Sequence, residues 1–494
     1  MPEKLFFENP SLLLAVLAPL AGAVLVMLTG KRPNVREACS FITAVITFGI
    51  VVSLVQPVLA GQKLICHVSY LLPGLSIALR ADSFSMVFAL VAASLWIVTV
   101  FYSLGYMRGL HEHDQTRFNA CFALALFGAL GCAFADNLFT LYLFYEIVSV
   151  STYPLVAHHQ DQEGYEGGRK YLTYLTATAK GLVLPAMIVT YCVCGTLDFS
   201  DNISSGIFPS EASRVLVTMT YAFLVLGFAK NGIMPFHHWL PGAMVAPTPV
   251  SALLHAVAVV KVGVFATTRV MLFTFGVDTM DAFNLGIPTA YFVSFTILAA
   301  SLIALSKDNL KARLAYSTVS QLSYVILGVA LLTPTGITGG LIHIVNHAFG
   351  KITLFFCAGA IYVASHKKNI SDMQGLGRVM PWTFGAFAIA ALTMIGVPPV
   401  GGFVSKWYLL VGAMDAAQTG ILIVLLASTM LNIAYFAPVV YTAFFCKPAH
   451  DRAYEGVREA APAMLVPLLI TASLSVAVGI YPDFFLRFIK GLFL

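Results

Sequence analysis

Several ionisable residues stand inside long runs of apolar residues, where a charge is costly. Glu146 lies within the apolar run 138–149. Lysines occur in the same setting at five other positions: Lys180, Lys230, Lys261, Lys351 and Lys406. A charge at the centre of a bilayer costs at least about 2.5 to 3.5 kcal/mol, so such residues need a partner or a function. Because one carboxylate cannot neutralise five ammonium groups, we expect several of these lysines to be uncharged part of the time.

The chemistry that these residue types predict is proton transfer. Burial disfavours the charged form of a lysine and a nearby carboxylate favours it, so a lysine under both influences can take up and release a proton. His255, His343 and His347 also fall within apolar runs, and imidazole exchanges protons near neutral pH. His343, His347 and Lys351 are four residues apart, which places them along one face of a helix. The pattern predicts a proton relay, with Lys180 as an additional candidate member.

Two other interpretations stay open for these residues. A buried lysine can pair with a carboxylate simply to hold helices together. Two histidines on one helix face can also hold a metal or a haem, but no acidic or cysteine residue adjoins His343 and His347, and the eight cysteines form no CxxC pair. We therefore expect no catalytic residue, no metal and no cofactor in this chain.

The elements that position these residues must be membrane-spanning helices. Of 494 residues, 59% are hydrophobic and 10% are charged, against about 25% charged in soluble domains. The positive net charge is spread over short loops, which argues against a nucleic-acid partner. Apolar runs long enough to cross a bilayer predict about fourteen spans in a single transmembrane domain, 1–494. They lie near 11–29, 37–60, 83–106, 117–135, 137–157, 169–194, 213–232, 250–275, 289–306, 313–332, 336–364, 383–412, 418–446 and 462–482.

Helix breakers lie next to two of the buried lysines. Four prolines between 235 and 249 follow Lys230, and Pro398, Pro399, Gly401 and Gly402 precede Lys406. Unwound backbone at membrane depth is tolerated only where protein or a water-filled cavity surrounds it. We therefore expect broken helices, open to water, at both lysines.

The loop charges predict an orientation. Most of the loop lysines and arginines fall in alternate loops on one side, around Lys31, Lys170, Lys311 and Lys368. Basic loops stay preferentially in the cytoplasm. Both termini are then extracytoplasmic, in a multi-pass protein of the cell or inner membrane.

Four stretches give the chain a family resemblance. The most specific is Ala246 to Ala256, APTPVSALLHA, which follows Lys230, Pro235 and Trp239. The others are residues 314–321 (LAYSTVSQ), 343–351 (HIVNHAFGK) and 398–406 (PPVGGFVSK). The chain resembles, over about residues 80 to 445, the antiporter-like subunits shared by respiratory complex I, the Mrp-type sodium/proton antiporters and the membrane-bound hydrogenases.

The resemblance implies a fold and a role for each matching residue. The implied fold has two inverted five-helix repeats, here near 117–275 and 289–446. Glu146 is similar to the family's gating glutamate, Lys230 to its partner lysine, and Lys406 to the lysine of the second broken helix. The remaining matches are similar to the family's connecting polar axis: His255, Lys261, His343, His347 and Lys351. Lys180 matches no assigned position.

The resemblance also suggests partners. The stretch after Lys261 and the presence of a lysine at 406 look most like the D subunit of an Mrp antiporter, which would translocate protons, with sodium as a further ion, alongside other membrane subunits. The alternatives are a proton-pumping subunit of a complex I-like NADH:quinone oxidoreductase or of a hydrogenase. A redox subunit that itself binds haem or quinone, and a scaffold whose charges only join helices, are two further alternatives.

Overall fold

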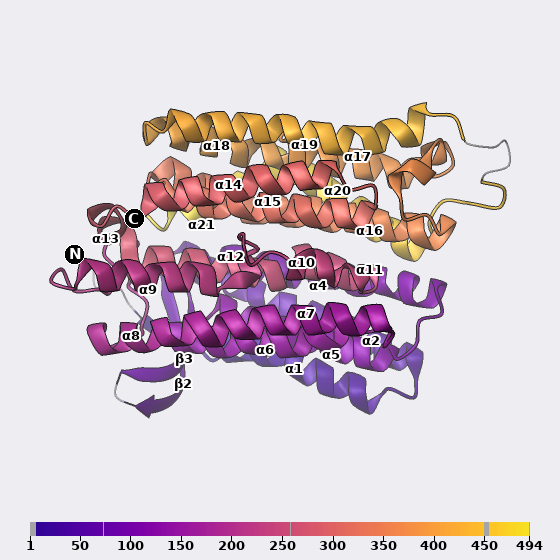
Figure 1. Cartoon of the computed structure of the whole chain (residues 1–494). Coiled ribbons are helices and arrows are strands. Elements are labelled where there is room, and N and C mark those ends of the chain that lie inside the picture. The colour runs from indigo at the N-terminus through magenta and orange to yellow at the C-terminus, as the bar shows by residue number, and fades with distance from the viewer. Residues whose placement is uncertain (1–5, 73, 257, 449–453, 494) are drawn as a thin grey trace.

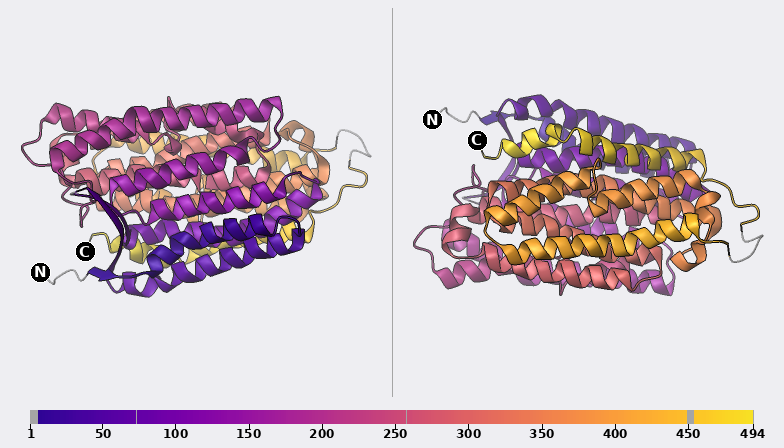
Figure 2. Two further views of the ribbon diagram at one scale, coloured as in Figure 1. Left: turned by 90° about the horizontal axis from the view of Figure 1, so that it is seen from below. Right: turned by 90° about the horizontal axis from the view of Figure 1, so that it is seen from above.

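The structure is a computed structural model that describes residues 6–72, 74–256, 258–448 and 454–493, without the side chains of residues 6, 7 and 254–256. Long helices lie side by side along one direction (Figures 1 and 2), and the N and C labels lie at the same end of the bundle. The prediction that the termini share one side of the membrane agrees with this arrangement. Which side that is stays a prediction.

Eleven stretches of described helix are long and apolar enough to cross a membrane. They are α1 (Ser11–Leu28), α2 with α3 (Pro33–Leu59), α4 (Ser83–Gly109), α5 (Gln115–Ala133), α6 (Leu138–Val156), α7 with η1 and α8 (Gln162–Cys194), α12 with η4 and α13 (Val259–Ala282), α14 (Gly286–Leu305), α16 (Pro334–Ser365), α19 (Thr419–Phe445) and α20 (Pro462–Ile480). The prediction of an all-α integral membrane protein is confirmed.

Four of the fourteen predicted spans differ from these long apolar helices. The span at 250–275 covers most of α11 (Thr248–Ala256) and the separate helix α12 (Val259–Val270). The span at 213–232 is the short helix α9 (Arg214–Gly227), followed by irregular backbone. The span at 313–332 is α15 (Leu310–Ala330), a full-length helix with more polar residues. The span at 383–412 is divided into α17 (Pro381–Ile395) and α18 (Gly401–Asp415). The sequence analysis predicted these two helices as one span because the residues between them are mostly apolar.

The first interruption follows α9. The backbone passes through the short 3-10 turn η2 (Ala229–Asn231), α10 (Trp239–Gly242) and η3 (Ala243–Val245) before α11 (Thr248–Ala256) begins. Where the helix is interrupted, side chains bond to main-chain carbonyl groups. The Asn231 side-chain amide donates to the Val225 carbonyl at 2.8 Å, and the Trp239 indole donates to the Ala229 carbonyl at 2.9 Å. Unwound backbone is thus stabilised inside the protein, as membrane depth requires.

The second interruption lies between α17 and α18. The Asn432 amide donates to the Met394 carbonyl at 3.2 Å, and the Lys406 ammonium donates to the Ile395 carbonyl at 2.8 Å. A side chain at Gly402 is excluded, because its Cβ would lie 1.7 Å from the Thr393 carbonyl oxygen. The glycine therefore lets the first turn of α18 approach the end of α17.

The two predicted repeats each contain one interrupted helix. The range 117–275 holds α5, α6, the long helix from α7 (Gln162–Thr178) to α8 (Leu184–Cys194), the interrupted α9 to α11, and α12 (Val259–Val270). The range 289–446 holds α14, α15, α16, the interrupted pair α17 and α18, and α19. Gly232, which follows η2, and Gly396, which follows α17, both have positive φ, 74° and 88°. The repeat boundaries and their inverted relationship stay predictions.

A small sheet, which the sequence analysis did not predict, lies near the N-terminal end of the chain. β1 (Phe6–Glu8) pairs in parallel with β2 (Lys63–Leu72), which pairs antiparallel with β3 (Leu75–Ala81). β3 leads into α4 across Asp82, whose carboxylate accepts a hydrogen bond from the Ser85 amide and caps the helix.

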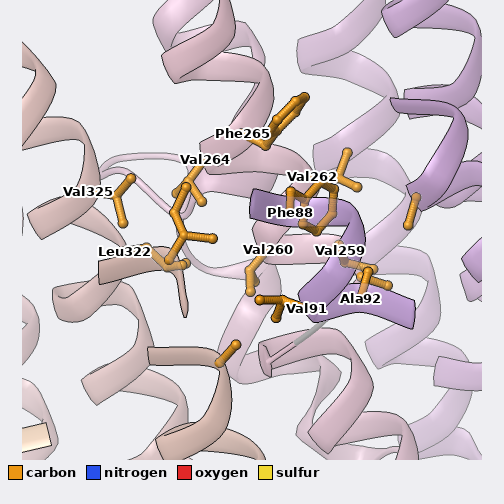
Figure 3. Close-up of a cluster of buried hydrophobic side chains, with 14 of the residues drawn as sticks. Phe88, Val91, Ala92, Val259, Val260, Val262, Val264, Phe265, Leu322 and Val325 are labelled. Carbon is orange, nitrogen blue, oxygen red and sulfur yellow. The ribbon is translucent and has the colours of Figure 1, made fainter. Parts of the chain in front are cut away.

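Helix α12 lies at the centre of the bundle. All of its residues are buried, and Figure 3 shows Val260, Val264 and Phe265 of α12 packed among Phe88 of α4 and Leu322 of α15. Gly263 allows α12 to approach η2, because a Cβ there would lie 2.2 Å from the main-chain nitrogen of Asn231. The apolar packing holds Lys261, on the same helix, in a fixed place at the core.

Candidate functional site

Lys230 lies in η2, at the first interruption, and is fully buried. Its ammonium donates to the Tyr145 carbonyl at 2.9 Å and to the Ser149 hydroxyl at 2.6 Å, and it lies 3.1 Å from the centre of the Tyr145 ring. Both partners are on α6, so the lysine joins the broken segment to that helix. All of these partners are neutral, which leaves the ammonium charge without a counter-ion in direct contact.

Glu146 follows Tyr145 on α6 and is partly buried, near the middle of the helix. Its Oε1 is buried with no hydrogen-bond partner among the described residues. Lys230 and Lys180 are the two cations that act on it electrostatically. The structure thus brings the predicted pair into one region, with Lys230 bonded to Tyr145 and Ser149 rather than to the carboxylate.

Lys180 lies in η1 (Ala179–Val183), a π-helical turn within the long helix 162–194. Its side chain is exposed on the outside of the bundle, unlike the other lysines predicted to take part. The sequence analysis treated it as buried, because an apolar run does not tell which face of a helix a residue occupies. π-helical turns are frequent at functional sites.

Lys261 and His347 are in direct contact. The Lys261 ammonium lies 2.8 Å from Nδ1 of His347, and both residues are fully buried. Lys261 is on α12 and His347 is on α16, so the contact joins the two predicted repeats. At this distance a proton can pass between an ammonium and a neutral imidazole nitrogen.

His343 continues the same face of α16, with its ring centre 5.9 Å from that of His347. Its Nδ1 lies 2.9 Å from the Ser405 hydroxyl, on α18 next to Lys406. The Lys406 ammonium bonds the Ile395 carbonyl and the Thr429 hydroxyl, at 2.8 and 3.3 Å, and lies 5.3 Å from the ring centre of Tyr324. That ring stacks on His343 at 5.4 Å. Lys261, His347, His343 and Lys406 are therefore connected, through Ser405 and Tyr324, in one buried cluster.

Lys351, one helical turn beyond His347 on α16, is also fully buried. Its ammonium donates to the Leu314 carbonyl at 3.1 Å and to the Ser317 hydroxyl, both on α15. Lys230 has the same kind of environment, a main-chain carbonyl and a serine hydroxyl of one facing helix. His255 was predicted to belong to the axis, but its side chain lies outside the described part of the structure.

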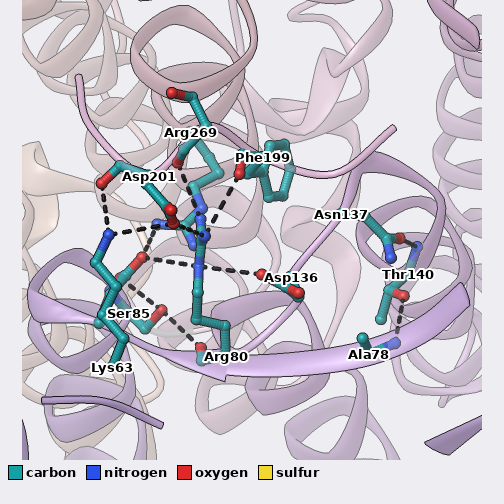
Figure 4. A network of polar contacts seen from close by, with 12 residues as sticks. Lys63, Ala78, Arg80, Ser85, Asp136, Asn137, Thr140, Phe199, Asp201 and Arg269 are labelled. Atoms are coloured by element: carbon teal, nitrogen blue, oxygen red, sulfur yellow. Dashed lines mark hydrogen bonds and ion pairs between the residues drawn. The ribbon is translucent and has the colours of Figure 1, made fainter. Parts of the chain in front are cut away.

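A buried ion cluster that the sequence analysis did not identify fixes one end of α12 (Figure 4). Arg269, fully buried, lies 2.7 Å from the Asp82 carboxylate. Arg80 bridges Asp82 at 3.4 Å and Asp136 at 3.1 Å. Burial acts to raise the pKa of the Asp82 carboxyl, but the Arg269 and Arg80 charges outweigh it and hold that pKa below its usual range. The sequence placed Arg269 at a helix end, and Asp82, two residues after Arg80, was the available signal.

A cavity of about 300 Å³ opens at the end of the bundle that carries the basic loops. Its lining includes Ala246 and Thr248 of the APTPV stretch, and Lys311, Lys367 and Lys368. The Lys311 ammonium donates to the Ala246 carbonyl at 2.7 Å. The cavity therefore leads from the basic surface to the start of α11.

Potential metal ligands lie apart from this buried cluster. All eight cysteines are free. In the described part of the chain, one group of histidine and acidic side chains is close enough to share an ion, Glu112, His113 and His158, and it lies in the connections after α4 and α6. The lysines and histidines of the core contact carbonyl, hydroxyl, imidazole and aromatic groups instead.

The fold and the buried cluster define a class: a multispanning membrane protein that holds ionisable side chains at membrane depth beside two interrupted helices. Residues 135–439 match the family model described as NADH:quinone oxidoreductase/Mrp antiporter, TM. The chain belongs to this family of antiporter-like membrane subunits.

Known relatives come from several kinds of complex. The chain is 31% identical over 448 residues to NADH-quinone oxidoreductase subunit N of Desulforudis audaxviator, with 87% of each chain covered. It is 29% identical over 470 residues to Na(+)/H(+) antiporter subunit A1 of Staphylococcus haemolyticus, covering 89% of this chain and 56% of that one. It is 28% identical over 446 residues to hydrogenase-4 component B of Escherichia coli, covering 85% and 65%.

Two solved structures share the fold across nearly the whole chain. One is the Mrp complex of Dietzia sp. DQ12-45-1b, with a TM-score of 0.86, 21% identity, and 98% and 96% of the two chains covered. The other is a membrane-bound sulfane sulfur reductase, an archaeal respiratory membrane complex, with a TM-score of 0.86, 24% identity, and 98% and 97% covered. These structures are of multisubunit membrane complexes.

Proposed function

We propose that the chain is the proton-translocating subunit of a multisubunit cation/proton antiporter, similar to an Mrp D subunit. The observation that carries the proposal is the contact of Lys261 with His347, at 2.8 Å, within a buried cluster that extends to Lys406. A helix-joining lysine needs a carboxylate, whereas this one faces an imidazole nitrogen. An ammonium and an imidazole in contact can exchange a proton but cannot neutralise one another.

The route that this arrangement supports runs across the two halves of the chain. Protons reach α11 through the cavity at the basic end, pass to Lys261 and His347, and continue along α16 through His343 to Lys406 at the second interruption. Glu146 and Lys230 control the first half. When the lysine turns toward the carboxylate, its charge is stabilised, and when it moves away from the carboxylate, burial without a counter-ion favours release of its proton.

Lys180 supports a contact with a neighbouring membrane subunit. It lies 18 residues from the start and 14 from the end of the helix 162–194, about 27 and 21 Å at 1.5 Å per residue. In a hydrocarbon core of about 30 Å, an exposed ammonium at that depth needs a polar partner. Within the chain its charge acts on Glu146, and we infer that a neighbouring subunit supplies a further polar partner, against the face that α7 and η1 present.

A redox-driven complex is the second candidate, favoured by a relative that the chain matches over 87% of its length, the N subunit of an NADH-quinone oxidoreductase. The two candidates share the proton route and differ in what drives it. In the antiporter a sodium or other cation gradient moves protons without an electron donor. In the redox complex, proton movement requires substrate oxidation. Haem or quinone bound by this chain would place it in a further class.

The decisive experiment uses the assembled complex reconstituted in sealed vesicles. We expect an imposed sodium gradient to produce a pH change inside the vesicles without any electron donor, as a pH-sensitive dye reports. Lys406→Ala should abolish most of this change, whereas Lys490→Ala, which alters an exposed lysine near the C-terminus, should not. A pH change that appears only with an electron donor would transfer the chain to the redox class. Full transport by Lys406→Ala in assembled complex would contradict the proton route.

A further inference from the structure

A cluster of histidine and acidic side chains lies apart from the buried lysines and histidines of the core, where two connections between helices meet. Glu112 and His113 lie in the connection from α4 to α5, and His158 and His159 follow the end of α6. One potential ligand atom from each of Glu112, His113 and His158 lies within 4.8 Å of the other two. Glu112, His113 and His158 take no part in the proton route described above, whereas His159 also lines the cavity at the basic end.

His158 is the residue that points to a missing ligand. Its side chain is fully buried, and neither ring nitrogen has a hydrogen-bond partner among the described residues. Its Nε2 faces the Glu112 carboxylate at 3.9 Å. Buried polar atoms are nearly always bonded, so two unbonded nitrogens on one buried ring call for an explanation.

The spacing of the atoms fits a shared ion better than direct hydrogen bonds. Glu112 Oε2 lies 3.9 Å from His158 Nε2 and 3.6 Å from His159 Nδ1. A hydrogen bond would bring such atoms to about 2.7 to 3.2 Å. Two ligands held about 2.0 to 2.1 Å from one tetrahedral ion are about 3.3 Å apart. The His113 and His158 rings stack with their centres 4.9 Å apart, so turning of these rings would be needed to bring the ligand atoms into coordination.

The surroundings supply the supports that a metal-binding histidine usually has. His113 Nδ1 lies 3.1 Å from the Asp114 carboxylate, which leaves Nε2 of the same ring for an ion. Such a carboxylate orients the ring and strengthens the ligand. Arg117, a neighbouring cation, is engaged elsewhere: it donates to the His158 carbonyl at 2.9 Å and lies 3.4 Å from Asp114. The Glu112 and Asp114 carboxylates supply the negative charge that a divalent cation requires.

We propose that Glu112, His113 and His158, with His159 as a fourth ligand, form a binding site for a divalent transition-metal ion, of which Zn²⁺ fits best. Imidazole nitrogen and a single carboxylate suit zinc, whereas magnesium and calcium prefer oxygen ligands. The bound ion links the α4–α5 connection to the end of α6, the helix that carries Glu146. It is therefore placed to restrain that helix from outside the membrane.

The test measures metal binding by the purified full chain and does not depend on transport. After treatment with a chelator, the protein is titrated with Co²⁺, whose visible absorption reports coordination, and its Zn²⁺ content is measured after dialysis against zinc. We expect one ion per chain. His158→Gln should abolish this binding, and His113→Gln should weaken it by about tenfold or more, as loss of a metal ligand or its support does.

A matched control is His366→Gln, which alters an exposed histidine in the connection that follows α16 and should bind like the wild type. Zn²⁺ should also raise the unfolding temperature of the wild type and the control, but not of His158→Gln, since a ligand stabilises only the state that binds it. His113 is half exposed, so His113→Gln gives a readout even if His158→Gln folds poorly. Absence of stoichiometric binding in the wild type, or wild-type affinity in His113→Gln, overturns the site.

Discussion

The Lys261 ammonium and the His347 imidazole meet at 2.8 Å across 86 positions of sequence. The contact connects α12, which ends the first predicted repeat, with α16 at the centre of the second. Any proton that passes between the two halves along this cluster must pass these two side chains or the water around them. Their coupling is therefore the first property to measure.

Replacing Lys261 with alanine should reduce proton transport by about tenfold or more, because positioned proton-transfer groups contribute roughly 10²- to 10⁴-fold where they act. His347→Gln should reduce it similarly. The effects of substituting contacting residues that act together are non-additive. The double variant should therefore transport no more slowly than the slower of the two single variants. The measurement is dye-reported proton movement in vesicles at equal complex content. Independent, multiplying losses would show that the two residues lie on separate routes.

Changing Glu146 to glutamine should also abolish most transport, because the neutral side chain keeps its size but cannot stabilise a charged Lys230. Glu211→Gln, at an exposed glutamate before α9, is the matched control. We further expect Glu146→Gln combined with Lys230→Ala to be no worse than either change alone. If well-assembled Glu146→Gln transports like the wild type, the carboxylate only joins helices.

Variants of Lys180 can distinguish a role in assembly of the complex from a role in proton transport within the chain. Lys180→Gln removes the charge and should lower the yield of neighbouring subunits that copurify with the chain, whereas Lys180→Arg, which keeps the charge, should retain most of it. Reporting copurification together with transport per assembled complex distinguishes the two roles. Normal assembly and normal transport in Lys180→Gln would remove the proposed partner contact.

Arg269 should matter for stability. Removing one member of a buried ion pair leaves an uncompensated charge, at a cost of about 3 to 5 kcal/mol. Arg269→Gln removes one cationic partner of Asp82, whereas Arg80 stays beside it at 3.4 Å. We therefore expect a loss of stability toward the lower end of that range. The measurement is the thermal unfolding temperature in detergent, with Arg487→Gln as the control, because Arg487 is an exposed residue of the C-terminal helix α21 (Asp483–Lys490). Equal unfolding temperatures for the two variants would show that the cluster adds no stability.

The orientation can be tested with single cysteines in a variant that lacks the native ones. A cysteine at Lys368 should react with a membrane-impermeant reagent only after the membrane is opened, and one at Lys490 should react in intact cells. The expectation rests on the preference of basic loops for the cytoplasm. Labelling of position 368 from outside would reverse the topology.

Much of this arrangement was predictable because a bilayer restricts what a sequence can do. Apolar length identifies spans, and prolines and glycines at 235–249 and 398–402 identify where helices break. Charge inside an apolar run identified Glu146, Lys230 and Lys406 as unusual without any knowledge of their neighbours. The prediction of the membrane class and of the family followed from these signals and is confirmed.

The features that the sequence did not reveal depend on which way each helix face is turned and on contacts between residues far apart in the chain. A run of apolar residues leaves the facing direction of Lys180 undetermined, so its exposure was missed. The contact of Lys261 with His347 and the ion pair of Arg269 with Asp82 join residues far apart in the chain, and single-sequence spacing carries no information on such pairs. The sheet was missed because β2 and β3 lie between predicted spans, in a segment taken as a loop.

The neutral surroundings of the core lysines limit how much charge the axis can store. Among the described side chains, no carboxylate lies within 4.0 Å of Lys230, Lys261, Lys351 or Lys406. Like charges repel strongly in a low-dielectric interior, so adding a second proton to this cluster costs more than adding the first. For the proposed proton route, this cost means that the cluster must release one proton before it accepts the next.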